Sequence, residues 1–252
     1  MSETTIFYSE SGNPAMLEAF QKAQASFKYF WRELSWEARR IVPALNLACV
    51  KIAFVEPTED ADAPLVEYMW INDVAFDGDI MRGTLLNDPE SLRQLQAGDF
   101  VQAPLAQVSD WLFYRDDKSY GGFTIQLMRS QMDAAERAEH DEAWGLNFGD
   151  FNEVLVVADQ REQPENLIEH PMSLNMKDRF VKFLQEYPQE AVSVDEAGYT
   201  MLHKEAIAGN RSLVEVLVHA GADPHQPARS GKSALDFARQ LDWPHLLPAL
   251  AG

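Results

Sequence analysis

The sequence predicts an α+β fold in two parts, an N-terminal helix with a curved antiparallel sheet and then a short all-α stack of repeats. Three patterns predict it. Apolar residues recur at three- and four-residue steps from Asn13 to about Arg40, the spacing of an amphipathic helix. From Leu45 apolar positions alternate, as in strands with one buried face. Gly198 and Gly231, 33 residues apart, open the similar phrases "GYTMLHKEA" and "GKSALDFAR", which indicates a repeat.

The N-terminal helix ends at Pro43, and a series of strands is expected after it. "LNLACVKIAF" is the first of these strands, and "EPTEDADAP" then forms a polar connection. "VEYMWINDVAF" and "IMRGTLL" flank residues 77–79, "DGD", which predicts a hairpin because Asp-Gly readily supplies positive φ angles. "NDPESLRQL" is expected to form a short helix with Asn87 or Asp88 as its cap.

The remaining segments set the expected domain boundaries. "FVQAPLAQVSDWLFY" alternates again, and "RDDK" turns the chain into "SYGGFTIQLMRSQ", expected to be a strand with a bulge or close backbone approach at Gly121 and Gly122. We expect an α+β domain over residues 1–132. Residues 133–170 are expected to form an acidic, partly structured connector with a helix-compatible start and a short strand at "EVLVVA". Residues 171–252 are expected to hold the repeats.

The segment that begins near Gly198 resembles an ankyrin repeat, whose unit is a β-turn followed by two antiparallel helices. "MKDRFVKFLQEYPQEAVSVD" resembles the second helix and loop of a truncated first repeat, and "SALDFARQLDWPHLLPAL" resembles a shortened closing repeat. Such ends are expected because terminal repeats turn one face to water. The residues that carry the likeness are Asp195, Gly198, Thr200, Leu202, His203, Ala206, Gly209, Leu213, Val214, Leu217, Gly221, Ala222 and Asp223.

The ankyrin resemblance implies that His203 is structural, because its imidazole would hydrogen-bond neighbouring backbone after the turn. Lys204 and Glu205 are then expected to lie on the helix surface as solvated charges. The resemblance also implies a binding module, since ankyrin repeats as a family bind proteins through loop tips and the concave helical face. The expected protein-binding residues are the exposed, variable positions Tyr199, Met201, Lys204, Glu205, Arg211, Arg229 and Lys232.

The N-terminal domain resembles the bacterial domain-of-unknown-function family 2314 over roughly residues 14–130. Members of this family have no agreed activity, so the resemblance implies a domain boundary and no reaction. The residues that carry it are Gly83, Asn87, Gly98, Asp99, Asp110, Trp111, Gly121, Gly122 and Thr124.

An enzyme or a small-ligand-binding protein with its site in the N-terminal domain is the alternative function. Asp110 beside Trp111 would be a general base if desolvation raised its pKa. The duller interpretation, which we favour, is an aspartate that anchors a turn while the tryptophan fills the core. We assign no catalytic residue. The residues expected to line such a pocket are Trp70, Asp110, Trp111, Tyr120 and Thr124.

Metal, phosphate and cofactor sites have little support in the sequence. Asp77 and Asp79 lack the further oxygen ligands of a calcium loop, and "SYGGF" lacks the lysine and the helix start of a phosphate loop. The six histidines never fall into H-x-x-x-H spacing. The single cysteine, Cys49, excludes an intramolecular disulfide and is expected to be a buried small hydrophobe. We therefore expect neither metal nor cofactor.

The charge limits the candidate partners. The formal net charge is −19, and residues 133–166 alone hold ten acids against two arginines. Such a charge repels phosphate backbones and anionic lipids, so nucleic acid and membrane surfaces are poor candidate partners. No stretch approaches the roughly 18 uninterrupted apolar residues of a membrane span, and residues 1–14 do not resemble a secretory signal.

We therefore expect a non-enzymatic interaction protein of the bacterial cytoplasm whose partner is another protein. A more specific hypothesis makes it an antagonist of a basic toxin, as bacterial immunity proteins often are, with acidic side chains steering the encounter. Solubility alone is the simpler explanation of the acidic surface. The sequence leaves open whether the chain dimerises.

Overall fold

The computed structural model describes residues 13–58 and 64–252. The first residues of the chain, where no secretory signal is expected, lie outside the described residues, as does the middle of the polar connection before the second strand. Within the described ranges, every helix is too short or too polar to cross a membrane.

The described residues fall into two compact units. One unit groups the residues up to Phe30 with Arg40–Val156, and the other groups Trp31–Arg39 with Val157–Gly252. Helix α1 (Pro14–Glu37) contributes residues to both units, because the division falls within it. The predicted N-terminal helix is thus confirmed, with its end a few residues before the expected position.

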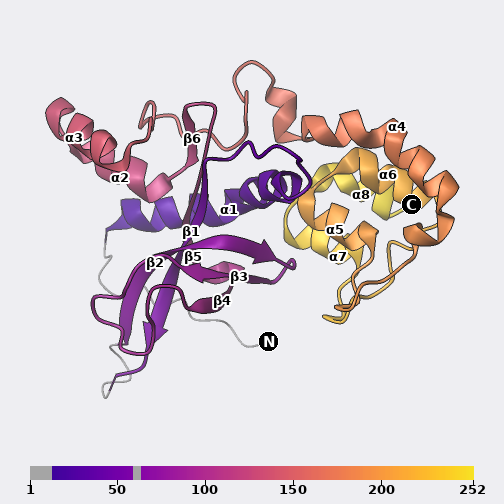
Figure 1. Ribbon diagram of the computed structural model, residues 1–252, viewed down its shortest axis with the longest axis horizontal. Coiled ribbons are helices and arrows are strands. Elements are labelled where there is room, and N and C mark those ends of the chain that lie inside the picture. The colour runs from indigo at the N-terminus through magenta and orange to yellow at the C-terminus, as the bar shows by residue number, and fades with distance from the viewer. Residues whose placement is uncertain (1–12, 59–63) are drawn as a thin grey trace. The chain divides into compact units, whose positions relative to one another are not determined.

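The first unit is built on a six-stranded antiparallel sheet with the strand order β4-β3-β2-β1-β5-β6 (Figure 1). Helix and antiparallel sheet confirm the predicted α+β class. Strands that follow one another along the chain are neighbours, except that β5 pairs with β1 at the centre of the sheet. The strands are β1 (Leu47–Glu56), β2 (Leu65–Phe76), β3 (Ile80–Leu85), β4 (Phe100–Pro104), β5 (Val108–Arg115) and β6 (Lys118–Gly121).

Aspartates form two of the hairpin turns. The Oδ1 atom of Asp77 accepts the backbone N–H groups of Asp79 at 3.0 Å and Ile80 at 2.8 Å, which closes the predicted turn between β2 and β3. Asp116 and Asp117 connect β5 to β6 with φ angles of 51° and 57°, values that aspartate tolerates better than most residues.

Helix α1 packs on the sheet through the stripe of aromatic residues that its sequence predicts. Phe27 meets Phe76 edge to face with 5.2 Å between ring centroids, and Phe30 lies 5.8 Å from Trp111. The Nε1–H group of Trp111 donates to the carbonyl oxygen of Ala23 at 3.0 Å, so the buried indole nitrogen has an acceptor. Gln24 of α1 also donates to the carbonyl oxygen of Val108 at 2.9 Å, so apolar burial and hydrogen bonds together fix this part of α1 to β5.

The segment after β6 is a helix, so the expected strand was wrong. Helix α2 (Phe123–Gln131) follows Gly121 and Gly122, whose φ angles are +77° and +71°. These left-handed residues turn the chain out of the sheet, and Asp110 then accepts the first backbone N–H groups of the helix. Ile125 of α2 packs on the buried Cys49, which confirms the expected place of this cysteine.

Two further expectations in this unit were wrong. Residues 87–95 form a loop and not a helix, because the carboxylate of Glu67 on β2 accepts the backbone N–H groups of residues 90–92 at 2.7–3.2 Å. Residues 153–158 form no strand. Leu155 instead offers its carbonyl oxygen to one backbone N–H group of β6 at 2.8 Å.

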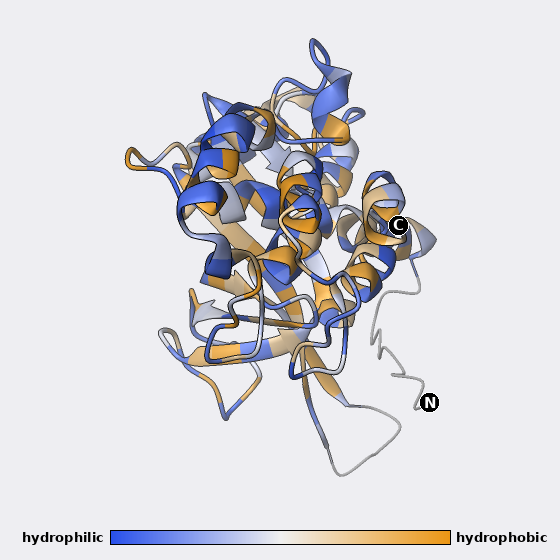
Figure 2. Cartoon of the chain, turned by 90° about the vertical axis from the view of Figure 1, so that its right-hand side faces the viewer, coloured by the Kyte–Doolittle hydropathy of each residue, from blue (hydrophilic) through white to orange (hydrophobic). Residues whose placement is uncertain are grey.

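The second unit contains the expected helix pairs of an ankyrin-like stack, with α5 and α6 as the full repeat. The apolar positions of that repeat are buried between the helices. Figure 2 shows that the helices carry hydrophobic positions in orange and hydrophilic positions in blue side by side. The helices are α4 (Pro171–Glu186), α5 (Met201–Ala208), α6 (Arg211–His219), α7 (Ala234–Gln240) and α8 (Leu247–Leu250), with short 3₁₀ turns at Pro164–Leu167, Pro188–Ala191 and Pro244–Leu246.

Candidate protein-binding site

Most of the predicted binding residues lie in or directly after two β-turns of the stack, residues 195–199 and 228–232. In the first turn, the N–H group of Asp195 donates to the carbonyl oxygen of Tyr199 at 2.9 Å. In the second, the N–H group of Ala228 donates to the carbonyl oxygen of Lys232 at 2.9 Å. Each residue of the second pair lies 33 positions after its counterpart, so the two turns are copies of one unit.

The structure brings residues of both turns together around Phe237. The ring of Tyr199 stacks on Phe237 with 6.0 Å between centroids, and the Nζ atom of Lys232 lies 5.9 Å from the same centroid. Arg229 covers Gly198 closely, because a Cβ atom built on this glycine would lie 2.9 Å from the Arg229 Cγ atom. The glycine therefore lets the second turn pack against the first.

Lys204 extends this cluster from helix α5. Its side chain is exposed and its Nζ atom lies 2.7 Å from the carboxylate of Asp195. Met201, at the start of the same helix, is partly exposed. We call the set of Asp195, Tyr199, Met201, Lys204, Arg229 and Lys232 the turn-tip surface.

The two other predicted residues have different surroundings. Glu205 is only 5% exposed, so its expected place as a solvated charge was wrong. Its carboxylate accepts hydrogen bonds from Arg39 at 2.8 Å and from the side chain of Asn210 at 2.7 Å. Arg211 is exposed on α6 and is paired with Glu215 at 2.8 Å. Neither residue belongs to the turn-tip surface.

His203 fixes the first turn to the chain beyond α6. Its Nδ1 atom accepts the backbone N–H group of Thr200 at 3.0 Å, and its Nε2 atom lies 2.9 Å from the carbonyl oxygen of Gln226. Burial lowers the pKa of His203, and the hydrogen bond to Gln226 opposes that shift. Both ring nitrogens of the neutral imidazole are engaged with backbone, which is the structural role implied by the ankyrin resemblance.

Ser233, Asp236 and Phe237 support this site but are not among the residues predicted for it. The side chain of Ser233 accepts the backbone N–H group of Asp236, and the carboxylate of Asp236 accepts that of Ser233, which forms a capping box. Thr200 and His203 form the same box 33 residues earlier. Aligning the two turns on the 33-residue period is the signal that finds these residues.

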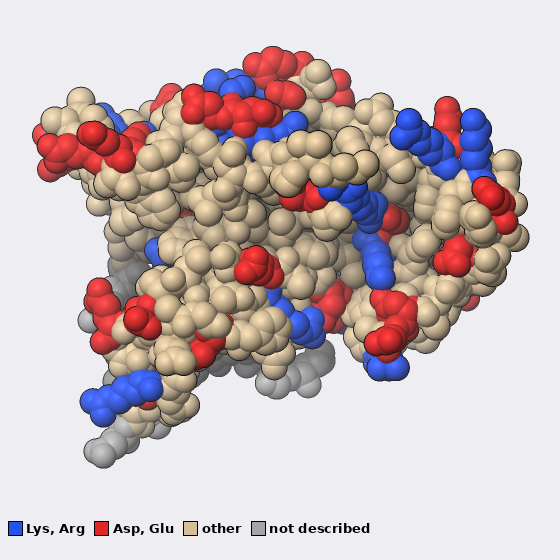
Figure 3. Space-filling view, in the orientation of Figure 1, with Lys and Arg blue, Asp and Glu red and all other residues tan. Residues whose placement is uncertain are grey.

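Acidic side chains gather on another surface, in the first unit. Asp133 caps helix α3 (Ala134–Trp144) by accepting the backbone N–H groups of Ala135 and Glu136. Figure 3 shows acidic residues over α3 at the upper left of the view. We call its exposed acids, Asp133, Glu136, Glu139 and Glu142, the α3 acidic surface.

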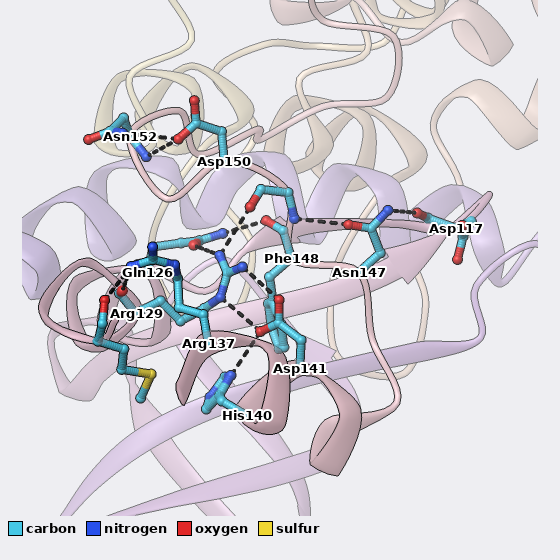
Figure 4. A network of polar contacts seen from close by, with 12 residues as sticks. Asp117, Gln126, Arg129, Arg137, His140, Asp141, Asn147, Phe148, Asp150 and Asn152 are labelled. Carbon is cyan, nitrogen blue, oxygen red and sulfur yellow. Dashed lines mark hydrogen bonds and ion pairs between the residues drawn. The ribbon is translucent and has the colours of Figure 1, made fainter. Parts of the chain in front are cut away.

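Arg129 holds α3 in place beside this surface (Figure 4). Its guanidinium group makes two bonds to the carboxylate of Asp141, at 2.9 and 2.7 Å. A further nitrogen binds the Gln126 side chain at 2.5 Å and the Gly149 carbonyl oxygen at 3.2 Å. Because Arg129 is 4% exposed and has protein partners on all sides, this network joins α2, α3 and the following loop.

The five residues considered for a pocket in the N-terminal domain are mostly core residues. Asp110, Trp111, Tyr120 and Thr124 are each exposed by 2% or less. Trp70 is partly exposed, with the Nζ atom of Lys51 5.7 Å from its ring centroid.

Asp110 acts as a remote cap for helix α2. Its carboxylate accepts four hydrogen bonds, from the N–H groups of Trp111, Phe123 and Thr124 at 2.8, 2.9 and 2.8 Å and from the Thr124 hydroxyl at 2.6 Å. Burial raises the pKa of Asp110, and these four bonds oppose the shift. This geometry agrees with the anchoring interpretation and leaves the carboxylate no solvent contact for proton transfer.

Comparison with known proteins gives the family of the chain. Residues 13–148 match the family described as "Uncharacterized protein conserved in bacteria (DUF2314)". The chain belongs to the DUF2314 family. The match covers α1 to α3 and the six strands and ends before α4, so the DUF2314 region is the helix-and-sheet part of the molecule.

Two curated relatives of this DUF2314 protein are informative. "Putative ankyrin repeat protein NMB1133/NMB1171" of Neisseria meningitidis serogroup B (strain ATCC BAA-335 / MC58) is 44% identical over 250 residues, which cover 99% of this chain and 98% of the relative. "Uncharacterized protein YegJ" of Escherichia coli (strain K12) is 34% identical over 59 residues, 23% of this chain and 39% of the relative. No solved structure matches significantly. The first relative confirms the ankyrin resemblance over a chain of the same extent.

Proposed function

We propose that this chain is a non-enzymatic protein–protein interaction protein of the bacterial cytoplasm that binds its partner through the turn-tip surface. The observation that carries this proposal is the packing of Tyr199 and Lys232, from two different turns, around Phe237. Tyrosine and arginine are among the side chains that most often supply binding energy at interfaces, and Arg229 packs on Gly198, the residue before Tyr199. The name of the meningococcal relative supports an ankyrin-based interaction.

We further propose that the partner is a basic protein and that the chain neutralises it, as an antagonist or immunity protein does. The net charge of −19 supports this, and the α3 acidic surface supplies a concentrated part of it. The turn-tip surface itself carries Lys204, Arg229 and Lys232 against Asp195, so electrostatic steering of a cation falls to α3. Steering of this kind raises the association rate and weakens with salt.

The test is affinity purification of the tagged full-length chain from its native cells at low and high ionic strength. The double variant E139K/E142K reverses charge on the α3 acidic surface, and Y199A/R229A removes two contacts from the turn-tip surface. The variant E162K/E165K is the control, because both positions are exposed and the net charge changes as much as in E139K/E142K. We expect one basic protein to be retained at low salt and released at high salt.

The outcomes separate the parts of the proposal. Loss of the partner in Y199A/R229A and in E139K/E142K, with retention in the control, supports both surfaces. Retention regardless of ionic strength contradicts the steering role. The absence of any stoichiometric partner at either ionic strength contradicts the interaction proposal as a whole.

A small-ligand function in the first unit has less support. A cavity of about 220 Å³ lies between α1 and α2, with Lys22, Gln126 and Asn152 among its lining residues. Pockets for drug-sized ligands usually measure about 300–1,000 Å³. The cavity that would support the alternative is therefore smaller than a usual ligand pocket.

A further inference from the structure

The residues directly before α4 form no inner helix of the kind that precedes the outer helix in a full ankyrin repeat. In the full repeat, α6 packs against its inner helix α5 and against α4. Before α4, residues 157–170 form loop and the short 3₁₀ turn Pro164–Leu167 in place of such a helix. The flank of α4 that faces α6 carries Lys177, Val181 and Leu184, which line a shared cavity with residues of α6.

Apolar residues form a stripe on another flank of α4, and the stripe ends at Tyr187, the residue directly after the helix. Met176, Phe180, Phe183 and Tyr187 follow one another at steps of four, three and four residues, the spacing of a coiled-coil seam. The rings of Phe180 and Phe183 stack with 6.1 Å between centroids, and those of Phe183 and Tyr187 lie 5.4 Å apart. All four side chains are at least partly exposed, and Tyr187 is 43% exposed.

The stripe is self-complementary. In an antiparallel helix pair related by a two-fold axis, residue i of one chain meets residue j of the other and j meets i. Met176 and Tyr187 lie equally far from the midpoint between Phe180 and Phe183. A two-fold axis through that midpoint therefore brings Phe180 of one copy against Phe183 of the other, and Phe183 against Phe180. Met176 of each copy then faces Tyr187 of the other.

Charged residues of opposite sign lie along one side of the stripe. Arg179 and Glu186 are both exposed. Although they are not equally far from the midpoint, they flank the same side, so an antiparallel pair of helices brings each towards the other in a second copy. Among the described residues Arg179 has no ion-pair partner of its own, and Glu186 accepts only the Tyr187 hydroxyl at 3.1 Å. Each chain therefore offers one unpaired cation and one accessible anion on the same side of the stripe.

Helix α4 is also a place where two copies of this acidic chain approach with little repulsion. It carries three cations, Lys177, Arg179 and Lys182, against two anions, Asp178 and Glu186. Figure 3 shows lysine and arginine side chains at the upper right of the view, over α4. We propose that α4 docks antiparallel against α4 of a second copy, through the aromatic stripe and two Arg179–Glu186 ion pairs. This inference does not depend on the proposed function.

Sedimentation equilibrium of the full-length chain tests the homodimer. We expect the mass of the wild type to rise from 28.5 kDa towards twice that value with concentration. In the proposed dimer, position 179 of each copy faces position 186 of the other. R179E alone and E186R alone each put like charges at both of these contacts, so each is expected to weaken association at least tenfold. An equimolar mixture of the two variants restores opposite charges at both contacts and is expected to restore the dimer.

The control variant is K182E, which changes the charge as R179E does but lies about 130° around the helix from the stripe. Circular dichroism checks that every variant keeps its helices. A wild type that stays at 28.5 kDa at every concentration overturns the inference. So does a dimer that persists in both single variants, or a mixture that remains monomeric while K182E dimerises.

Discussion

The Nε2 atom of His203 lies 2.9 Å from the carbonyl oxygen of Gln226, so one imidazole joins the start of α5 to the loop beyond α6. The Nδ1 atom of the same ring holds the backbone N–H group of Thr200. One side chain thereby stabilises the cap of one helix and the position of the next turn, and the geometry of the turn-tip surface depends on it.

Removal of this imidazole is expected to destabilise the repeats. H203A leaves the N–H group of Thr200 and the carbonyl oxygen of Gln226 without their buried partner, which costs about 1–3 kcal/mol. Urea unfolding measures the loss. The control H219A removes an exposed histidine from α6 and should change the free energy of unfolding by less than about 0.5 kcal/mol. Equal effects of the two variants contradict the proposed role of His203.

Stability is expected to decrease as the pH falls from neutral towards 5. Burial lowers the pKa of both His203 and His245, and the Nε2 atom of His245 lies 3.0 Å from the carbonyl oxygen of Gly209. Unfolded histidine titrates near pH 6.5, so the unfolded chain binds protons first, and the stability present above that pH is progressively lost below it.

Urea unfolding at pH 7.5 and pH 5.5 checks this dependence. Each histidine contributes at most about 1.4 kcal/mol per pH unit. The variant H203A should lose less stability over this range than the wild type does, because one of the two histidines with a lowered pKa is gone. An identical pH dependence in the two proteins would rule out His203 as a source of it.

The charge of Asp110 is expected to matter for the fold and not for a reaction. In D110N an NH2 group replaces one of the two carboxylate oxygens, so two of the four buried donors lose their acceptor. We expect the free energy of unfolding to fall by about 2–4 kcal/mol, because hydrogen bonds to a buried charge are strong. T124V removes only the 2.6 Å hydroxyl bond and should cost less, about 1 kcal/mol. Thermal unfolding ranks the variants, and a D110N chain as stable as T124V contradicts the remote cap.

Gly121 is expected to tolerate no side chain. A Cβ atom there would lie 2.2 Å from the carbonyl oxygen of Trp111 and 2.4 Å from its ring, and the φ angle is +77°. Gly98 has a similar φ angle of +87° but open space around it, so G98A measures the backbone strain alone, about 1 kcal/mol. G121A should lose at least about 3 kcal/mol in urea unfolding. Equal losses of stability in G121A and G98A would contradict this prediction, because the contact with Trp111 would then add nothing to the backbone strain.

Local patterns in the sequence predict much of this fold. The alternation in β1 and β5, the Asp-Gly turn at Asp77 and the 33-residue period each depend on residues close together in the chain. The errors have a different origin. Phe123, Ile125 and Leu127 alternate like a strand, and the acid that caps their helix, Asp110, lies 13 residues before its first residue.

The candidate site shows the same limit. The period of 33 residues locates Tyr199 and Lys232 at equivalent turn positions, but no local pattern shows that both pack on Phe237. Glu205 is polar and precedes a helix end, so the sequence suggests exposure. Its burial depends on Arg39, which lies 166 residues away in the chain, and on Asn210.

The division within helix α1 affects which fragments recombination or proteolysis can separate from this protein. Trp36, which donates to the side chain of Asn210 at 3.0 Å, and Arg39 belong to the same unit as the repeats although 117 residues of the other unit separate them in the sequence. The repeats are therefore not a module that a single recombination event or a single proteolytic cleavage transfers whole. A fragment that starts after residue 156 loses about two turns of helix, residues 31–37, whose side chains bond to Ile168 and Asn210, so it lacks part of its own compact unit.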